Sequence, residues 1–277
     1  MKIYLGPAGL PTISKGKTVP EGIKDLIDLG LNANEIQFTY GVRMDLKTAE
    51  ECGKIANKKV LLSVHCPYYI NLCSQEKEKL EASKKRIIES CERAEKMNAT
   101  IATFHPGFYG KLSKEKAFDA VKSACEEIVD ELKSRLIKSV NLGLETTGKQ
   151  ATFGTLEEII EICKKVKRCL PVIDFSHIYA RAGGEIDYGK IFDKLEQLKL
   201  THYHTHFTGV EVSKLGIEKG NEKYHLEIKS NKPPFEPLAK EILKRKLDIT
   251  IISESPVLEQ DSLVMKKIFE KLGHRFK

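Results

Sequence analysis

The chain has 277 residues, of which 41% are hydrophobic and 31% are charged, and its formal net charge is +7. This length and apolar content exclude a disordered chain, and (β/α)8 barrels reach roughly 250 residues as one domain. No apolar run approaches the ~20 residues of a membrane-spanning helix, and the amino terminus has no apolar signal segment. We therefore expect a cytoplasmic protein with no membrane partner.

The cysteines and the basic charge narrow the class further. Seven cysteines are scattered without a C-x-x-C pair, which is typical of reduced thiols in the cytosol and not of a disulfide framework. The net charge has two interpretations. One is a solvated surface rich in Lys and Glu, and the other is attraction to a polyanion such as nucleic acid. Charge alone does not decide between them.

Short apolar runs along the chain predict eight β-strands. Most runs are continuous and not alternating, which is typical of strands that are buried on both faces. The predicted strands are Ile3–Leu5, Glu35–Thr39, Val60–His65, Thr100–His105, Asn141–Glu145, Val172–Phe175, Thr201–Phe207 and Ile249–Glu254.

Helical patterns lie between and after these strands. Two capping boxes are predicted, Thr48 with Glu51 and Thr155 with Glu158, and Ser113 is a predicted N-cap. The predicted helices are Glu21–Leu29, Lys47–Lys58, Lys77–Met97, Lys114–Lys138, Leu156–Lys167, Tyr188–Leu198, Phe235–Lys246 and Ser262–Leu272.

Alternation of eight strands with eight helices predicts a parallel sheet that closes into a TIM (β/α)8 barrel, with residues 1–277 as a single domain. The alternative, an open doubly wound sheet, needs a glycine-rich phosphate turn. The segment Gly6–Gly9 lacks the G-x-G-x-x-G spacing of such a turn. The long lysine-rich connection from Thr208 to Pro234 is more typical of a functional segment than of an idle loop.

Side chains that can bind metal lie at the carboxyl ends of six successive predicted strands. In TIM barrels the active site lies at the carboxyl ends of the strands. Imidazole and carboxylate donors together suit zinc, manganese or iron. Three histidines and three carboxylates are more ligands than one tetrahedral ion needs. We therefore expect two or three ions, with Glu145 bridging two of them. The six residues are His65, His105, Glu145, Asp174, His206 and Glu254.

Each of these residues also has a purely structural interpretation. A histidine at a strand end commonly bonds a loop, Glu145 could pair with a lysine, and Asp174 with His177 could be a helix cap. Their recurrence at six strand ends argues against this interpretation. In HYHTHFTG, alternation places His202, His204 and His206 on one face. We select His206 as the ligand, with His204 as a substitute or supporting partner and His202 as structural.

At these residues the sequence resembles the endonuclease IV family of apurinic/apyrimidinic endonucleases, over essentially the whole chain. The matching segments are HCPYYINL (65–72), FHPG (104–107), LETTG (144–148), IDFSH (173–177), HFTG (206–209) and ISESP (252–256). The later segments also fit the wider xylose-isomerase-like barrel superfamily. The resemblance implies a TIM barrel that binds a cluster of three zinc ions and cleaves DNA 5′ to an abasic sugar.

The resemblance also implies a role for each candidate ligand. His65 and His105 would bind one Zn²⁺, and Glu145 would bridge to a second ion. The ligands completing the second site would be Asp174, His206 and Glu254. His177 and His225 would bind a third, where the family pattern is Asp-x-His. This chain has Lys223 at the aspartate position, and a lysine cannot replace a carboxylate ligand. Either Glu222 or a water substitutes, or only two ions bind.

The implied reaction needs no side-chain nucleophile, because a hydroxide held between the metals attacks phosphorus. Glu145 or Glu254 orients or deprotonates the water that supplies it. The implied partner is double-stranded DNA with abasic sites, bound by a monomer. Tyr68 and Arg43 are candidate wedges that fill the gap left by an extruded sugar. Simple rim packing and a solvated loop charge are the alternatives. Four lysines suit phosphate contacts or a solvated loop, namely Lys214, Lys219, Lys223 and Lys229.

Two further functions remain open. A single-metal sugar isomerase or epimerase of the same superfamily would use only Glu145, Asp174, His206 and Glu254. His65 and His105 favour the nuclease because one ion does not require them, whereas Lys223 favours the isomerase. A non-catalytic binder of DNA lesions is the third function, and the complete set of six ligands argues against it.

Overall fold

The computed structural model of the protein describes residues 1–276, which divide into two compact units. The first unit comprises residues 1–34, 148–150 and those from 173 onward. The second unit comprises residues 35–147 and 151–172. A single domain over 1–277 remains a prediction.

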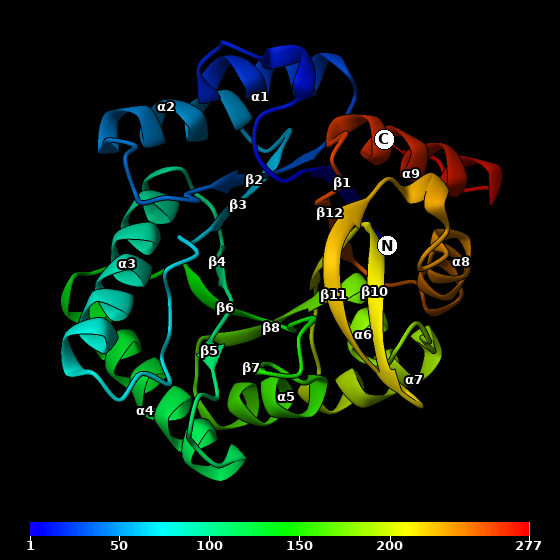
Figure 1. Cartoon of the computed structure of the whole chain (residues 1–277). Coiled ribbons are helices and arrows are strands. Elements are labelled where there is room, and N and C mark those ends of the chain that lie inside the picture. Colours follow the sequence, from blue (N-terminus) through cyan, green and yellow to red (C-terminus); the bar gives the residue numbers. More distant parts are fainter. Residues whose placement is uncertain (277) are drawn as a thin grey trace. The chain divides into compact units, whose positions relative to one another are not determined.

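All eight predicted strands are present within the described residues, with ends shifted by a few positions. They belong to one parallel sheet, in the order β1-β12-β9-β8-β6-β4-β3-β2, and helices separate them along the chain (Figure 1). Parallel strands need such crossover helices. The strands are β1 (Ile3–Pro7), β2 (Ala33–Gln37), β3 (Leu61–His65), β4 (Ile101–Phe104), β6 (Asn141–Glu145), β8 (Cys169–Asp174), β9 (Tyr203–Phe207) and β12 (Ile249–Ser253).

The predicted helices are also present. Each buries one apolar stripe, so packing and not propensity alone stabilises it. They are α1 (Val19–Asp28), α2 (Leu46–Ala56), α3 (Lys77–Lys96), α4 (Lys114–Ser134), α5 (Leu156–Lys165), α7 (Tyr188–Leu195), α8 (Phe235–Arg245) and α9 (Glu259–Lys271). None of the helices among residues 1–276 is long and apolar enough to cross a membrane.

The helix starts test the capping predictions. The Thr155–Glu158 capping box is confirmed, and Ser113 accepts a hydrogen bond from the Lys116 backbone N–H. The Thr48 capping box is wrong. Helix α2 begins earlier, because the carboxylate of Asp45 accepts from the Thr48 N–H at 2.7 Å and supplies the N-cap.

Several elements were not predicted. The segment 208–234 contains an antiparallel hairpin of β10 (Gly209–Gly216) and β11 (Lys219–Leu226), drawn in yellow in Figure 1, followed by the short 3-10 helix η3 (Ile228–Ser230). Its strands are mostly polar, and most of their residues are half-buried or exposed, so they lack the apolar signal of a buried strand. Helix α6 (Phe175–Arg181) and the two-residue strands β5 (Gly107–Phe108) and β7 (Thr152–Phe153) are too short for periodicity to reveal.

Each unit has an apolar core. In the first unit Phe207, Phe235 and Phe269 form edge-to-face contacts, with centroids 4.9 and 5.7 Å apart. In the second unit the buried side chains include Ile87, Phe104 and Val121. All seven cysteines are free thiols, as expected.

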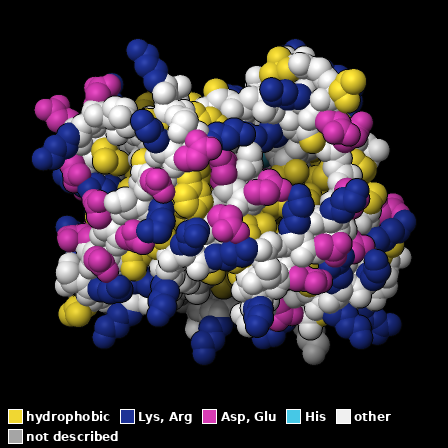
Figure 2. Space-filling model, turned by 90° about the horizontal axis from the view of Figure 1, so that it is seen from below, with side chains coloured by type: hydrophobic (Ala, Val, Ile, Leu, Met, Phe, Trp, Pro, Cys, Tyr) yellow, Lys and Arg dark blue, Asp and Glu magenta, His cyan; other side chains and the backbone are white. Residues whose placement is uncertain are grey.

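Charges of both signs are interspersed on the surface that Figure 2 shows. Among the described residues, many charged side chains form short ion pairs along helices, such as Lys54 with Glu50 at 2.7 Å. Exposed pairs of this kind add little stability individually. On this face the charges therefore form a mixed surface and no patch of one sign.

The first glycine of the Gly6–Gly9 segment has a packing role. A Cβ at Gly6 would lie 1.6 Å from the backbone oxygen of Ala33. We expect Gly6→Ala to lower the free energy of unfolding by at least about 2 kcal/mol, because backbone atoms must move. Urea denaturation monitored by circular dichroism measures this change.

Gly189→Ala is the matched control. Gly189 lies in α7, where the nearest atom to a new Cβ is 3.4 Å away, so this change should be neutral or stabilising by up to about 1 kcal/mol. Equal effects of the two substitutions would contradict the steric explanation of Gly6.

Candidate metal centre

In the second unit two histidines converge on a buried carboxylate. The Nε2 atom of His65 lies 3.2 Å from Glu145 Oε2, and the Nε2 atom of His105 lies 3.0 Å from the same oxygen. His65 and Glu145 are the last residues of β3 and β6, and His105 directly follows β4. Parallel strands that end at one edge therefore bring together three residues that are far apart in sequence.

Backbone contacts fix this group. The Nδ1 atom of His65 lies 2.8 Å from the Cys66 carbonyl oxygen, so an Nδ1–H donates there and Nε2 faces the carboxylate. A second ring nitrogen held in this way is typical of a metal-ligating histidine. After His105 the chain turns at Gly107, where φ is +144° and a Cβ would lie 2.3 Å from Asn71 Oδ1. The H-P-G sequence thus supplies a turn that only glycine fits.

The first unit places Asp174, His206 and Glu254 together. His206 Nδ1 lies 3.2 Å from Glu254 Oε1, and one ligand atom of each of the three residues lies within 4.8 Å of the others. Asp174 ends β8 and also caps α6, because its Oδ1 accepts from the His177 N–H at 2.7 Å. The cap and the ligand interpretations of Asp174 are therefore compatible.

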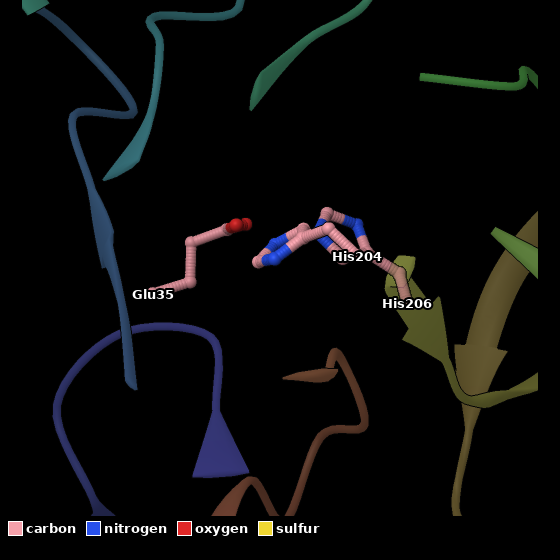
Figure 3. A group of neighbouring side chains, drawn as sticks. All are labelled: Glu35, His204 and His206. Carbon is pink, nitrogen blue, oxygen red and sulfur yellow. The ribbon is translucent and has the colours of Figure 1, made fainter. Parts of the chain in front are cut away.

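The three histidines in and just before β9 differ in their contacts. Figure 3 draws the rings of His204 and His206 extending from β9, with centroids 5.8 Å apart. His202 lies two residues before His204 and its Nε2 lies 2.8 Å from Thr250 Oγ1. Its hydrogen bond to another strand agrees with a structural role.

A third group lies wholly in the first unit and includes Glu222, which the sequence offers only as an alternative ligand. His177 Nε2 lies 3.3 Å from Glu222 Oε2, and His225 Nε2 lies 3.4 Å from Glu222 Oε1. Burial raises the pKa of the Glu222 carboxyl, but the hydrogen bonds and charges of both histidines outweigh it and hold the pKa well below its usual value. Burial lowers the pKa of His225, but the bond to Glu222 prevails and raises the pKa to about 9.

All three groups fit a divalent transition ion. Imidazole with carboxylate is a donor set that suits zinc, manganese or iron. In each group of three, the donor atoms lie within 4.8 Å of one another. The predicted ligands His65, His105 and Glu145 are together in the second unit. In the first unit Asp174, His206 and Glu254 form one group, and His177 and His225 form another with Glu222.

The sequence reasoning missed the carboxylate of Glu35. This residue lies in β2 and is fully buried, and its Oε2 accepts from Ser63 Oγ at 2.9 Å and Thr103 Oγ1 at 3.2 Å. It is drawn in Figure 3. A glutamate at the start of the predicted buried strand Glu35–Thr39 was the available signal, because a buried carboxylate needs polar partners.

The candidate DNA-contacting residues are exposed. Tyr68 is 60% exposed, and its ring packs edge-on against His65 with centroids 6.2 Å apart. Arg43 is exposed on the segment between β2 and α2. Lys223 is exposed on β11 and does not belong to the Glu222 group. Lys229 pairs with Glu227 at 2.7 Å.

Comparison with known proteins places the chain in a family. Residues 23–268 match the family model described as a xylose isomerase-like TIM barrel, and the chain belongs to this family. A protein of Methanocaldococcus jannaschii, named only as uncharacterized, is 34% identical over 98% of both chains. A protein of Mycoplasma mobile named probable endonuclease 4 is 28% identical over 76% of this chain and 74% of its own. The resemblance to endonuclease IV proteins is thereby confirmed.

Solved structures agree with the fold. The structure of endonuclease IV from Thermus thermophilus has a TM-score of 0.69 at 16% identity and covers 98% of both chains. A D-tagatose 3-epimerase-like protein has a TM-score of 0.70 at 19% identity, with 96% of both chains covered. At such identities the likeness concerns the fold alone. The predicted (β/α)8 TIM barrel is confirmed.

The lowered pKa of His202 predicts how the free energy of unfolding depends on pH. Burial, and next the charge of His204, lowers the pKa of His202 to about 4. The unfolded chain, with a pKa near 6.5, binds the proton more readily. The contribution of neutral His202 to the stability of the folded state is therefore present above about pH 6.5 and is lost as the pH falls toward about 4.

In His202→Gln this dependence should disappear. Between about pH 6 and pH 5 the free energy of unfolding should fall less in the variant than in the unchanged protein, by up to about 1 kcal/mol. Urea denaturation at both pH values measures the difference. If the free energies of unfolding of the two proteins changed equally with pH, His202 would not have a lowered pKa in the folded state.

Proposed function

We propose that the protein is a zinc-dependent apurinic/apyrimidinic endonuclease that hydrolyses the phosphodiester 5′ to abasic sites in DNA. The observation that carries this proposal is the group of His65 and His105 around Glu145, which exists in addition to the group of Asp174, His206 and Glu254. The donors are too many for one tetrahedral ion. Relatives named endonuclease 4 support the same chemistry.

The proposed ligand sets follow from these groups and from the family resemblance. His65, His105 and Glu145 hold one ion, and Glu145 bridges to a second that Asp174, His206 and Glu254 complete. His177 and His225 contribute to a third. Glu145 is suited to bridging because one oxygen of its buried carboxylate already lies within 3.2 Å of two imidazole nitrogens.

Bound zinc ions would acidify a water and place positive charge beside the phosphodiester. The protein supplies positioning and proton transfer. The His65 ring is held by the Cys66 carbonyl, which keeps Nε2 directed at the Glu145 carboxylate. Glu254 has a side chain that is 14% exposed, against 0% for Glu145. It is therefore the more accessible acceptor for the proton of the attacking water, and Glu145 orients that water.

DNA recognition is assigned to exposed side chains. Tyr68 fills the space left by the extruded sugar, Arg43 lies on a neighbouring segment, and Lys223 contacts phosphate. An aromatic ring and cations are the groups that stack on bases and pair with backbone phosphates. We propose that a cytoplasmic monomer, folded as one domain, binds double-stranded DNA in this way.

The central test is cleavage of a duplex containing one tetrahydrofuran abasic analogue by zinc-loaded protein. Glu145→Gln should lower the cleavage rate at least about 100-fold, because it removes the proposed bridging charge. It should also reduce the bound zinc, as measured by mass spectrometry.

Glu158→Gln is the control in the same unit. Its carboxylate caps α5 and accepts from Tyr109 Oη at 2.7 Å, so cleavage should persist with some loss of stability. No cleavage by the unchanged, zinc-loaded protein would refute the nuclease. One bound ion with ketose–aldose activity on small sugars would instead establish the isomerase, which uses only Glu145, Asp174, His206 and Glu254.

The role of Tyr68 has its own test. Tyr68→Ala should weaken binding to the abasic duplex about tenfold, because stacking on a base contributes ~1–3 kcal/mol. Fluorescence anisotropy with a cleavage-resistant duplex measures the affinity. Binding to the undamaged duplex is the internal control and should change little. An equal loss for both duplexes would argue against a wedge.

A further inference from the structure

The hairpin of β10 and β11 contains an irregular pairing at Lys223. Val210 pairs with His225 and Glu211 with Tyr224, but the next residue of β10, Val212, pairs with Glu222. Lys223 is thus an extra residue without an opposite partner in the ladder. Two residues of one strand against one of the other is the pattern of a β-bulge.

The bulge changes which side chains share a face. In a regular strand, residues three positions apart point to opposite sides. Glu222 and His225 are three apart, yet the extra residue between them restores the phase, and both side chains contact one another at 3.4 Å. Lys223 itself is exposed. The bulge therefore directs the carboxylate of Glu222 toward His225. In the family pattern the carboxylate stands one residue later, at the position that Lys223 occupies here.

Both histidines that face Glu222 have an oxygen near their other ring nitrogen. Nδ1 of His225 lies 2.9 Å from the Glu254 carbonyl oxygen, at hydrogen-bond distance, and Nδ1 of His177 lies 3.5 Å from Asp174 Oδ2, which is a longer contact. Each ring presents Nε2 to the Glu222 carboxylate. A metal-ligating histidine typically has this arrangement, with its second nitrogen held by a carbonyl or a carboxylate.

Gly148 leaves the room that this group occupies. A Cβ at Gly148 would lie 2.8 Å from Glu222 Oε2 and 2.9 Å from His177 Cδ2. The Glu222 N–H donates to the Gly148 carbonyl at 2.9 Å, which holds β11 against this glycine. The last residue of the LETTG segment is therefore small because Glu222 and His177 cover it.

We propose that Glu222, turned inward by the bulge at Lys223, is the carboxylate ligand of a divalent metal site that it forms with His177 and His225. The proposal rests on the multi-metal character of the proposed function and adds the ligand that Lys223 cannot supply. The three donors are two imidazoles and one carboxylate, the set found at zinc sites with an open position. A metal-free ion-pair cluster is the competing arrangement.

Metal counting tests the ligand directly. Protein stripped with a chelator is reloaded with zinc, and bound zinc per chain is measured by mass spectrometry after dialysis against a competing chelator. Glu222→Gln should lose about one equivalent, or bind it at least about tenfold more weakly. Glu218→Gln, at an exposed position near the hairpin tip, is the matched control and should keep the full count. Equal counts in both variants would overturn the proposal.

A second pair of variants tests the bulge. Lys223→Ala should keep the zinc count, because the exposed side chain is not a donor. In Glu222→Gln combined with Lys223→Asp, the new carboxylate should point outward and the lost equivalent should not return. Recovery of that equivalent would show that position 223 faces the site, and it would overturn the assignment.

Crystals of the unchanged protein grown with zinc give a result that does not depend on a variant folding. An anomalous peak about 2.0–2.2 Å from Glu222, His177 and His225 would support the site. Zinc on the histidines without Glu222, or no zinc there, would overturn it. Neither measurement involves DNA, so a fully loaded protein that fails to cleave abasic DNA would refute the nuclease and leave Glu222 as a ligand.

Discussion

The buried carboxylate of Glu145 is the constraint on which the candidate centre depends. An ionised carboxylate removed from water is strongly destabilised unless it is paired and hydrogen-bonded. Two imidazoles from neighbouring strand ends meet its Oε2 within 3.2 Å. Because the three residues are contributed by β3, β6 and the turn after β4, the sheet must fix their spacing before any ion or substrate arrives. Removing Glu145 would take away the carboxylate that both histidines contact.

Helix caps, glycine turns and a β-bulge position the other metal-capable side chains. Asp174 accepts the His177 N–H as the cap of α6, so one residue both starts a helix and presents a second oxygen to the His177 ring. Gly107 and Gly148 keep their positions clear of side chains that would collide with Asn71 and with Glu222. The bulge at Lys223 adjusts the phase of β11. The donors thus depend on turns, caps and a bulge as much as on the strands that precede them.

The strands, most helices and the strand-end donors could be predicted from sequence, because continuous apolar runs and capping residues are local signals. The residues 208–234 could not, since an exposed polar hairpin has no apolar period. The same segment explains why Glu222 entered only as an alternative. Glu222 and His225 are three residues apart, so strict alternation would place them on opposite faces of the strand. The bulge that puts them on one face depends on the pairing with β10, which the sequence alone does not show. Asp45 in place of Thr48 shows that helix starts, too, depend on which acceptor lies nearest.

The barrel itself does not distinguish a nuclease from a sugar epimerase, because solved structures of both kinds resemble it to a similar degree. The distinction lies in donors that a single ion does not use. His65 and His105 gather at Glu145 in one unit, and Glu222 joins His177 and His225 in the other, so four histidines and one carboxylate lie outside the set that an isomerase would use. An isomerase would gain nothing from keeping these additional donors in mutual contact. Phosphodiester cleavage uses several ions at once, since attacking and leaving oxygens both carry charge.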